Sequence, residues 1–329
     1  MKNRFLISWI LWTILGIALI YGVTTSDSGN NLISIIAITL SLSPIFGLML
    51  TLGSPKNATQ FNNWLRDNKN SLYYTGGGFT ILFALPGILT WTFDPYYTVI
   101  FSATVFVIFG LMKETSDKKQ MWSWADLAIW IILWIPFDLR WIMDTLPAVD
   151  AVSYTWWAMA ISVIAVVALY GYKGLDIGYN LVPKRKDFLI VLLALTGIMV
   201  LVVPPGLLTG FLTFSIPEHY DVPKLIIHFV GLFLTVALPE ELFFRGILLR
   251  RLETVFTKKW IPFVISSVAF GLMHWNNVST LSVQITYISL ATVAGMGYAW
   301  AFRKSGNNLF VAILTHTLVD WLWKLFLAS

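Results

Sequence analysis

Long stretches without charged residues recur from one end of this sequence to the other, and they limit its fold more than any other feature. A helix that crosses the hydrocarbon core of a bilayer needs about 17–25 predominantly apolar residues. About eleven segments reach or approach this length, namely residues 5–23, 32–52, 73–93, 97–112, 125–143, 154–172, 187–214, 225–249, 260–274, 283–302 and 308–326. The pattern predicts an all-α, polytopic membrane protein with about eleven transmembrane helices.

The composition excludes several other classes of protein. Of the 329 residues, 57% are hydrophobic and only 12% are charged, whereas a soluble domain has about 25% charged residues. We therefore expect neither a soluble enzyme nor a disordered chain. The basic residues are spread along the loops, so we expect no nucleic-acid partner. The absence of Cys excludes disulfides and thiolate metal sites.

Basic residues favour one side of the membrane. Arg4 precedes the first expected span, and later basic groups, including residues 184–186, 250–251 and 303–304, follow at every second loop. Cytoplasmic loops carry an excess of Lys and Arg. We therefore expect a multi-pass protein of the cell membrane with its N-terminus inside, and the lipid bilayer as one of its partners.

The two parts of the sequence differ in where their ionisable residues lie. In residues 1–186, which contain about six expected spans, Asp126, Asp138 and Arg140 lie near span ends. We interpret these three as interfacial residues, or as a local Asp138–Arg140 pair. In residues 187–329, ionisable residues lie well inside the spans, where they are costly and mark functional sites. We therefore expect an N-terminal transmembrane region, residues 1–186, and a functional domain, residues 187–329.

The densest group of charges in the second part follows Pro239. Glu240 and Glu241 are adjacent, and Arg245 follows Glu241 by four residues. Residues at this spacing share one face of a helix, so Glu241 and Arg245 can form an ion pair. Glu240 lies about 100° further around the helix and is left to act elsewhere, as a catalytic base would.

Two further groups follow in later spans. His274 shares a helix face with Phe270, and His316 shares one with Asp320, again four residues away. A carboxylate at this spacing can orient the imidazole or share a ligand with it. Between these groups, Ala291, Gly295 and Ala299 form a face of small residues, which predicts a close approach of helices.

These groups, taken in order, resemble a known family. Glu-Glu-x-x-x-Arg, then Phe-x-x-x-His, then His-x-x-x-Asp is similar to the motif order of the CPBP family of CAAX proteases and bacteriocin-processing enzymes, also called Abi, and Phe244-Arg245-Gly246 strengthens the match. The resemblance covers about residues 187–329. It implies an intramembrane protease similar to the CAAX prenyl endopeptidase, or a member tied to peptide maturation or bacteriocin immunity.

The resemblance also implies site residues and a chemistry. Glu240, His274 and His316 would be catalytic, and Glu241, Arg245 and Asp320 would support them. Peptide hydrolysis needs an activated water, a polarised carbonyl and a proton for the leaving amine. Our hypothesis is that Glu240 is the general base assisted by His274, and that His316 and Asp320 stabilise the oxyanion. Glu241 and Arg245 would hold this geometry, or Arg245 would meet a substrate carboxylate.

Two questions about this chemistry stay open at the level of sequence. The first is whether a metal takes part: His274, His316 and Glu240 could bind Zn²⁺ and leave one position for water, whereas no His-Glu-x-x-His motif is present. The second is the task of Asp320, where the family more often has Asn. Asp320 could donate a hydrogen bond while protonated, orient His316, or bind the metal.

The substrate would be a membrane-associated protein or peptide, hydrolysed at a peptide bond. Two other functions suit the same residues. Intramembrane carboxylates and His also build the relays of ion- or proton-coupled transporters, although no inverted repeat is visible in the sequence. A non-catalytic immunity or regulatory scaffold with the same fold is the second alternative.

Overall fold

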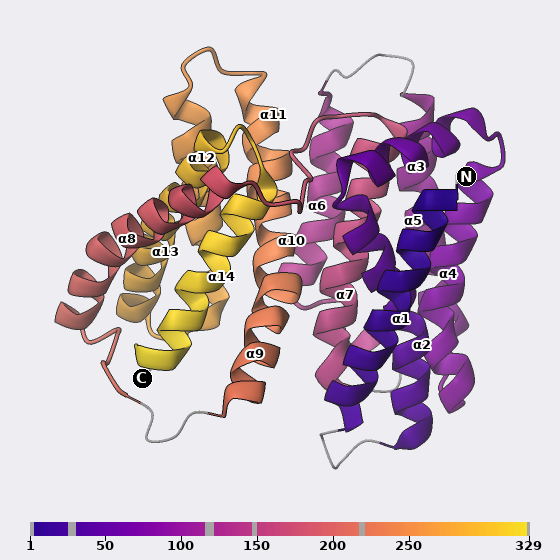
Figure 1. Cartoon of the computed structure of the whole chain (residues 1–329), viewed down its shortest axis with the longest axis horizontal. Coiled ribbons are helices and arrows are strands. Elements are labelled where there is room, and N and C mark those ends of the chain that lie inside the picture. The colour runs from indigo at the N-terminus through magenta and orange to yellow at the C-terminus, as the bar shows by residue number, and fades with distance from the viewer. Residues whose placement is uncertain (1–2, 26–30, 116–121, 147–149, 217–220, 328–329) are drawn as a thin grey trace. The chain divides into compact units, whose positions relative to one another are not determined.

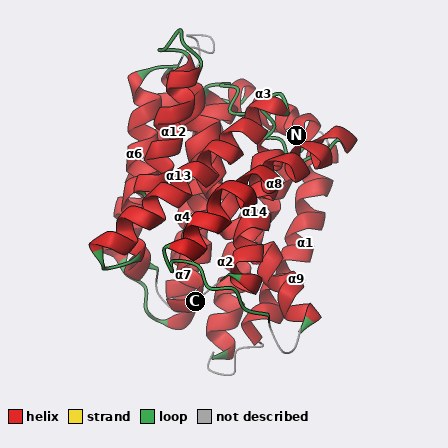
Figure 2. Cartoon of the chain, turned by 90° about the vertical axis from the view of Figure 1, so that its left-hand side faces the viewer, coloured by secondary structure: helices red, strands yellow, loops and turns green. Residues whose placement is uncertain are grey.

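The computed structural model describes residues 3–25, 31–115, 122–146, 150–216 and 221–327, and within them it contains helices and loops but no strand (Figure 1, Figure 2). The all-α fold expected from the sequence is thereby confirmed. The chain forms two compact units, Met1–Asp176 and Ile177–Ser329. The basic stretch 184–186 therefore belongs to the second unit. The assignment of the functional domain to residues 187–329 stays a prediction.

The first unit is a bundle of helices around α2 and α7. Its elements are α1 (Asn3–Thr25), α2 (Leu32–Leu52), α3 (Pro55–Asp67), α4 (Ser71–Thr90), α5 (Pro95–Glu114), α6 (Trp124–Asp138), the short η1 (Met143–Thr145), α7 (Asp150–Ala165) and the π-helical η2 (Val166–Tyr172). An aromatic cluster joins α4, α5 and α7: Phe83 stacks on Phe101 with ring centroids 4.5 Å apart, and both rings contact Trp156 and Trp157. Most side chains of α1, in contrast, are exposed.

Asp126 has a buried partner that the sequence analysis did not identify, Lys173. Its side chain is fully buried, and Oδ1 lies 2.5 Å from Nζ of Lys173. Its Oδ2 accepts from the backbone N–H of Ser123, the residue that caps α6. Lys173 is distant from Asp126 along the chain and follows η2, which continues α7, the helix against which α6 packs, so residue spacing could not indicate this pair. This buried pair fixes the start of α6 within the first unit.

The second unit holds the segment with the charged motifs. Its elements are α8 (Arg185–Leu208), α9 (Val222–Gly231), the π-helical η3 (Leu232–Ala237), α10 (Leu238–Glu241), the π-helical η4 (Leu242–Leu249), α11 (Arg250–Glu253), α12 (Trp260–Leu272), the short η5 (Trp275–Asn277), α13 (Leu281–Lys304) and α14 (Leu309–Phe326). Helix α13 packs against α8, α12 and α14, and α14 also packs against α8 and η3. Residues from α8, α13 and α14 form a buried apolar core.

The described residues contain nine helices that are long and apolar enough to cross a membrane. About eleven were expected from the sequence. Two of the expected spans, 125–143 and 260–274, are helical but short, since α6 has 15 residues and α12 has 13. Helix α6 ends near Arg140, whose backbone is left-handed with φ 60°. The expected span 187–214 also ends early, at Leu208, soon after Pro204 and Pro205, which lack the N–H of a helical hydrogen bond.

The helix that carries the paired glutamates is not a regular α-helix. Between Val222 and Glu253 it changes from α to π geometry at η3, returns to α at α10, and becomes π again at η4. Pro239 in α10 has no N–H to donate and its ring crowds the preceding turn, which explains the wider turn just before it. Segments of π-helix frequently mark functional sites, and here they flank Glu240 and Glu241.

Candidate active site

Glu241 and Arg245 form the buried centre of the candidate site. Nη1 of Arg245 donates to Oε1 of Glu241 over 2.9 Å, and both side chains are completely buried. The ion pair expected from the four-residue spacing is thereby confirmed. Each charge removes part of the cost that the other would carry alone in an apolar interior.

Arg245 is also held by helix α13 and by aromatic rings. Its Nη2 donates to the backbone carbonyl of Gly295 over 2.8 Å. Its guanidinium carbon lies 4.4 Å from the ring centroid of Phe270 and 5.3 Å from that of Tyr298. An arginine over an aromatic face is attracted by the ring. Because Arg245 has no exposed surface and two of its nitrogens are bonded, this geometry favours the holding role over contact with a substrate carboxylate.

His316 on α14 is bound to the same carboxylate. Its Nδ1 lies 2.9 Å from Oε1 of Glu241, and since a carboxylate only accepts, Nδ1 is the donor. Its ring stacks on Tyr298 with centroids 4.4 Å apart, and the ring of Phe270 lies nearly perpendicular to it with centroids 5.6 Å apart. The hydrogen bond and the two rings together fix the imidazole, which is 3% exposed.

The second nitrogen of His316 faces two further carboxylates. Its Nε2 lies 3.3 Å from Oδ2 of Asp320 and 3.8 Å from Oε2 of Glu240. Unlike Glu241, these two acidic side chains are partly accessible: Glu240 is 17% exposed and Asp320 is 24% exposed. The side chains of Glu240 and Asp320 are therefore the part of the site that solvent can reach, although the Oε2 atom of Glu240 that faces His316 is itself buried.

His274 lies just beyond the end of α12 and contacts the same aromatic rings. Its Nδ1 lies 3.0 Å from the carbonyl of Phe270 and must donate to it, because a carbonyl only accepts. Its ring centroid lies 5.0 Å from the centroid of the Phe270 ring and 4.9 Å from that of the Tyr287 ring. His274 also lies within electrostatic range of His316 and Asp320. Phe270 thus contacts both imidazoles of the predicted site.

The geometry bears on the alternative of a zinc site. Within the part of the chain that the structure describes, no three His, Asp or Glu side chains form a group that could hold a metal ion. The Nδ1 atoms of His274 and His316 are engaged by Phe270 and Glu241, respectively, which leaves Nε2 as the nitrogen through which either ring could bind a metal. Because the three side chains of His274, His316 and Glu240 do not form such a group, they do not fit a three-ligand zinc site here, and we derive no catalytic step through a metal.

Two contributions to the site were missed by the sequence analysis. The first is Tyr298, which stacks on His316, and the second is the backbone carbonyl of Gly295, which accepts from Arg245. The available signal was the run of small residues around Gly295, which predicted a close approach of helices. That approach is confirmed, because a Cβ on Gly295 would lie 3.0 Å from both Arg245 and Phe270.

Comparison with known proteins gives one match. Residues 222–322 match the family described as Type II CAAX prenyl endopeptidase, Rce1-like. No curated protein matches the chain, and no solved structure does. The matched range contains all the predicted site residues, which are Glu240, Glu241, Arg245, His274, His316 and Asp320. The resemblance inferred from the three motifs is thereby confirmed.

Proposed function

The chain belongs, through residues 222–322, to the Rce1-like family of type II CAAX prenyl endopeptidases. From this premise we propose that it is an intramembrane endopeptidase. In this proposal, Glu240 activates the water molecule that attacks the peptide bond. The family and the apolar helices identify, in general terms, a multi-pass membrane protein of the CAAX-protease type. The assignment of Glu240 and the nature of the substrate are our own proposals.

The observation that carries this proposal is the convergence at Nε2 of His316. Glu240 and Asp320 approach this nitrogen from two different helices, α10 and α14, and both side chains are partly exposed. Behind them, Glu241 is fully buried and bound to Arg245 and His316. The site therefore has an accessible acid–base group and a rigid support, as general acid–base catalysis requires.

The proposed reaction needs no covalent enzyme intermediate. Glu240 takes a proton from a water molecule, and the water oxygen attacks the carbonyl carbon of the scissile peptide bond. His316 and Asp320 stabilise the charge that develops on the carbonyl oxygen. The carbon–nitrogen bond then breaks, and the proton held by Glu240 passes to the leaving amine. The products are a new carboxylic acid, which releases its proton to solvent, and a new amino terminus, so that one water is consumed for each bond broken.

His274 is proposed to assist Glu240 with the water. Since its Nδ1 donates to the carbonyl of Phe270, a neutral His274 carries its lone pair on Nε2 and can accept a hydrogen bond there. Arg245 and Glu241 take no part in proton transfer in this proposal. They keep His316 in place, and Gly295 on α13 keeps Arg245 in place.

We propose a membrane-associated protein or peptide as the substrate, since the site lies in a segment of membrane-spanning character. The family description names a prenyl endopeptidase, and a lipidated C-terminal peptide is accordingly the first substrate class to test. The distribution of basic residues supports a cell-membrane protein with its N-terminus inside.

The experiment compares peptides from membranes of cells that carry wild-type protein or Glu240→Gln. Mass spectrometry of new termini should show at least one cleavage product that disappears in Glu240→Gln. Glu114→Gln, the same substitution at an exposed position at the end of α5, should keep the product. Cleavage that persists in a stably folded Glu240→Gln would refute the proposed role of Glu240. Ion flux into proteoliposomes that is lost in the same variant would indicate a transporter instead.

A further inference from the structure

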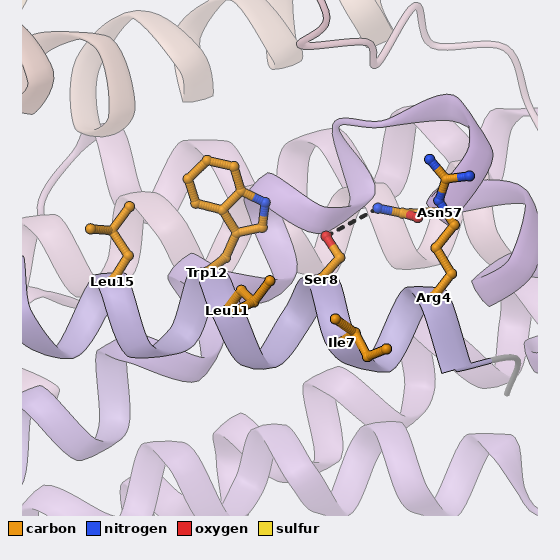
Figure 3. A pocket seen from close by; sticks show the side chains of 7 residues that line it. All are labelled: Arg4, Ile7, Ser8, Leu11, Trp12, Leu15 and Asn57. Carbon is orange, nitrogen blue, oxygen red and sulfur yellow. Dashed lines mark hydrogen bonds between the residues drawn. The ribbon is translucent and has the colours of Figure 1, made fainter.

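The first unit contains a groove that the protease chemistry does not use. It has a volume of about 660 Å³ and is lined by Arg4, Ile7, Ser8, Leu11, Trp12, Leu15 and Asn57 (Figure 3). All these residues belong to α1 except Asn57, which lies on α3. Pockets that bind small molecules have volumes of about 300–1,000 Å³, so the groove is large enough for a ligand.

One end of the groove is polar. Arg4 is exposed, and within the described residues it forms no ion pair or hydrogen bond. Asn57 is only 7% exposed, and its Nδ2 donates to Oγ of Ser8 over 3.1 Å (Figure 3). Its Oδ1 is buried without a hydrogen-bond partner. Because a buried acceptor without a donor costs about 1–3 kcal/mol, this oxygen points to a ligand with a hydrogen-bond donor.

The rest of the groove is apolar and follows α1 inward. Arg4, Ser8, Leu11 and Leu15 are spaced by four, three and four residues and therefore lie on one face of the helix. At a rise of 1.5 Å per residue, Leu15 lies about 16 Å further along the axis than Arg4. The side chains of Leu11 and Leu15 are 61% and 43% exposed. The groove thus changes from cationic to apolar along the helix.

The direction of this change identifies the class of ligand. The stretch Arg4–Gly22 is a candidate membrane span, so the polar end lies where the span begins and the apolar part extends along it. A lipid in a bilayer has the same order, with its phosphate at the surface and its acyl chains inside. Trp12, with an apolar ring and one N–H, is a residue type enriched near such a boundary.

We propose that this groove binds a phospholipid whose headgroup contains a hydrogen-bond donor, as phosphatidylglycerol does. The phosphodiester pairs with Arg4, a hydroxyl of the headgroup donates to Oδ1 of Asn57, and one acyl chain lies along Leu11, Trp12 and Leu15. An arginine is suited to a phosphate because its N–H groups match the phosphate oxygens. The proposal gives the first unit a specific lipid site and does not depend on the protease activity.

The test is native mass spectrometry of the full chain in detergent, titrated with phosphatidylglycerol or phosphatidylcholine of identical acyl chains. Phosphatidylcholine has the phosphate but no donor in its headgroup. Wild-type protein should bind phosphatidylglycerol more tightly. Arg4→Gln should weaken this binding roughly tenfold, as expected for loss of one charge-assisted hydrogen bond. The matched control is Arg185→Gln, which removes an exposed arginine at the start of α8 and should bind like wild type.

Asn57→Leu provides an independent readout. It removes the buried acceptor, so it should reduce the preference for phosphatidylglycerol over phosphatidylcholine, leaving the part that comes from Arg4, while the melting temperature in detergent stays the same or rises. Inorganic phosphate should fail to displace the lipid, because it lacks acyl chains. Equal binding of the two lipids by wild type, equal losses in Arg4→Gln and Arg185→Gln, or displacement by inorganic phosphate would each overturn the proposal.

Discussion

His316 and Glu241 are joined by a 2.9 Å hydrogen bond between Nδ1 and Oε1, across two helices that are distant in the sequence. The same Oε1 atom accepts Nη1 of Arg245, also over 2.9 Å. One carboxylate oxygen is therefore shared by a permanent cation and an imidazole in a fully buried position. Loss of its negative charge would affect the fold and the site together.

Glu241→Gln should therefore reduce both stability and activity. The substitution keeps the shape of the side chain but leaves the charge of Arg245 uncompensated, and removal of one partner of a buried pair costs about 3–5 kcal/mol. The measurement is thermal unfolding in detergent beside a cleavage assay, with Glu240→Gln as the comparison. Glu240 is partly exposed, so Glu240→Gln should lose activity with little change in melting temperature.

The double variant Glu241→Gln/Arg245→Leu separates charge from packing. Because it removes both members of the pair, no unpaired charge remains, and part of the lost stability should return. Activity should stay low, since His316 has lost its charged anchor. An unfolding temperature of Glu241→Gln equal to that of wild type would show that the pair contributes no net stability.

The spacing of residues predicted the local parts of this site. Glu241–Arg245 and His316–Asp320 are each four residues apart on one helix, and both contacts occur in the structure. The long apolar runs predicted the helical fold for the same reason, since the signal is local. Contacts within one helix can therefore be inferred from sequence alone.

Contacts between helices could not be predicted in this way. Residue spacing does not indicate that Nδ1 of His316 bonds to Glu241 and not to Glu240, because the choice depends on how α14 is rotated against α10. The stacking of Tyr298 on His316 and the partner of Asp126, Lys173, are of the same kind. The π-helical segments on both sides of Pro239 could not be predicted either, because the spacing argument assumes a regular helix of 3.6 residues per turn.

Gly295→Ala should reduce stability and cleavage by displacing Arg245, although Gly295 itself takes no part in the reaction. A Cβ at this position would lie 3.0 Å from Nη2 of Arg245 and from Cδ1 of Phe270, so the guanidinium or the ring must move. We expect a loss of about 1–3 kcal/mol, as for other overpacked positions, and a lower cleavage rate. Gly197→Ala in α8 is the matched control because nothing lies within 4 Å of its Cβ. This control should be neutral or slightly stabilising, and a similar loss in both variants would argue against the proposed strain on Arg245.

Removal of divalent metal ions should leave cleavage unchanged. The described residues contain no group of three His, Asp or Glu side chains that could hold a metal ion. The assay is cleavage after dialysis against a strong chelator, with a soluble zinc protease in the same buffer as a positive control for metal removal. If chelation abolished cleavage and added Zn²⁺ restored it, the result would contradict the metal-free scheme and support the alternative of a zinc site.

Asp320→Asn distinguishes the remaining roles of Asp320. Oδ2 of Asp320 lies 3.3 Å from Nε2 of His316, but His316 is already oriented by Glu241 through its other nitrogen. Asp320 is therefore not needed to hold the ring, and we favour its role as a hydrogen-bond donor to the oxyanion. An Asp donates only while it carries a proton, whereas Asn donates at every pH. Asp320→Asn should accordingly keep activity within about tenfold of wild type, since one hydrogen bond contributes about 1 kcal/mol, and should keep it to higher pH.

The matched variant is Asp320→Leu, which has a similar volume and no donor. It should lose most activity with an unchanged melting temperature, because Asp320 is partly exposed and its removal leaves Glu241, Arg245 and His316 bound to one another. Cleavage rates of both variants measured across a range of pH give the comparison. A steep loss in Asp320→Asn, with normal stability and unchanged metal content, would contradict the donor role. It would show that an ionised Asp320 acts on His316, so that the charge and not the hydrogen-bond donor is required at this position.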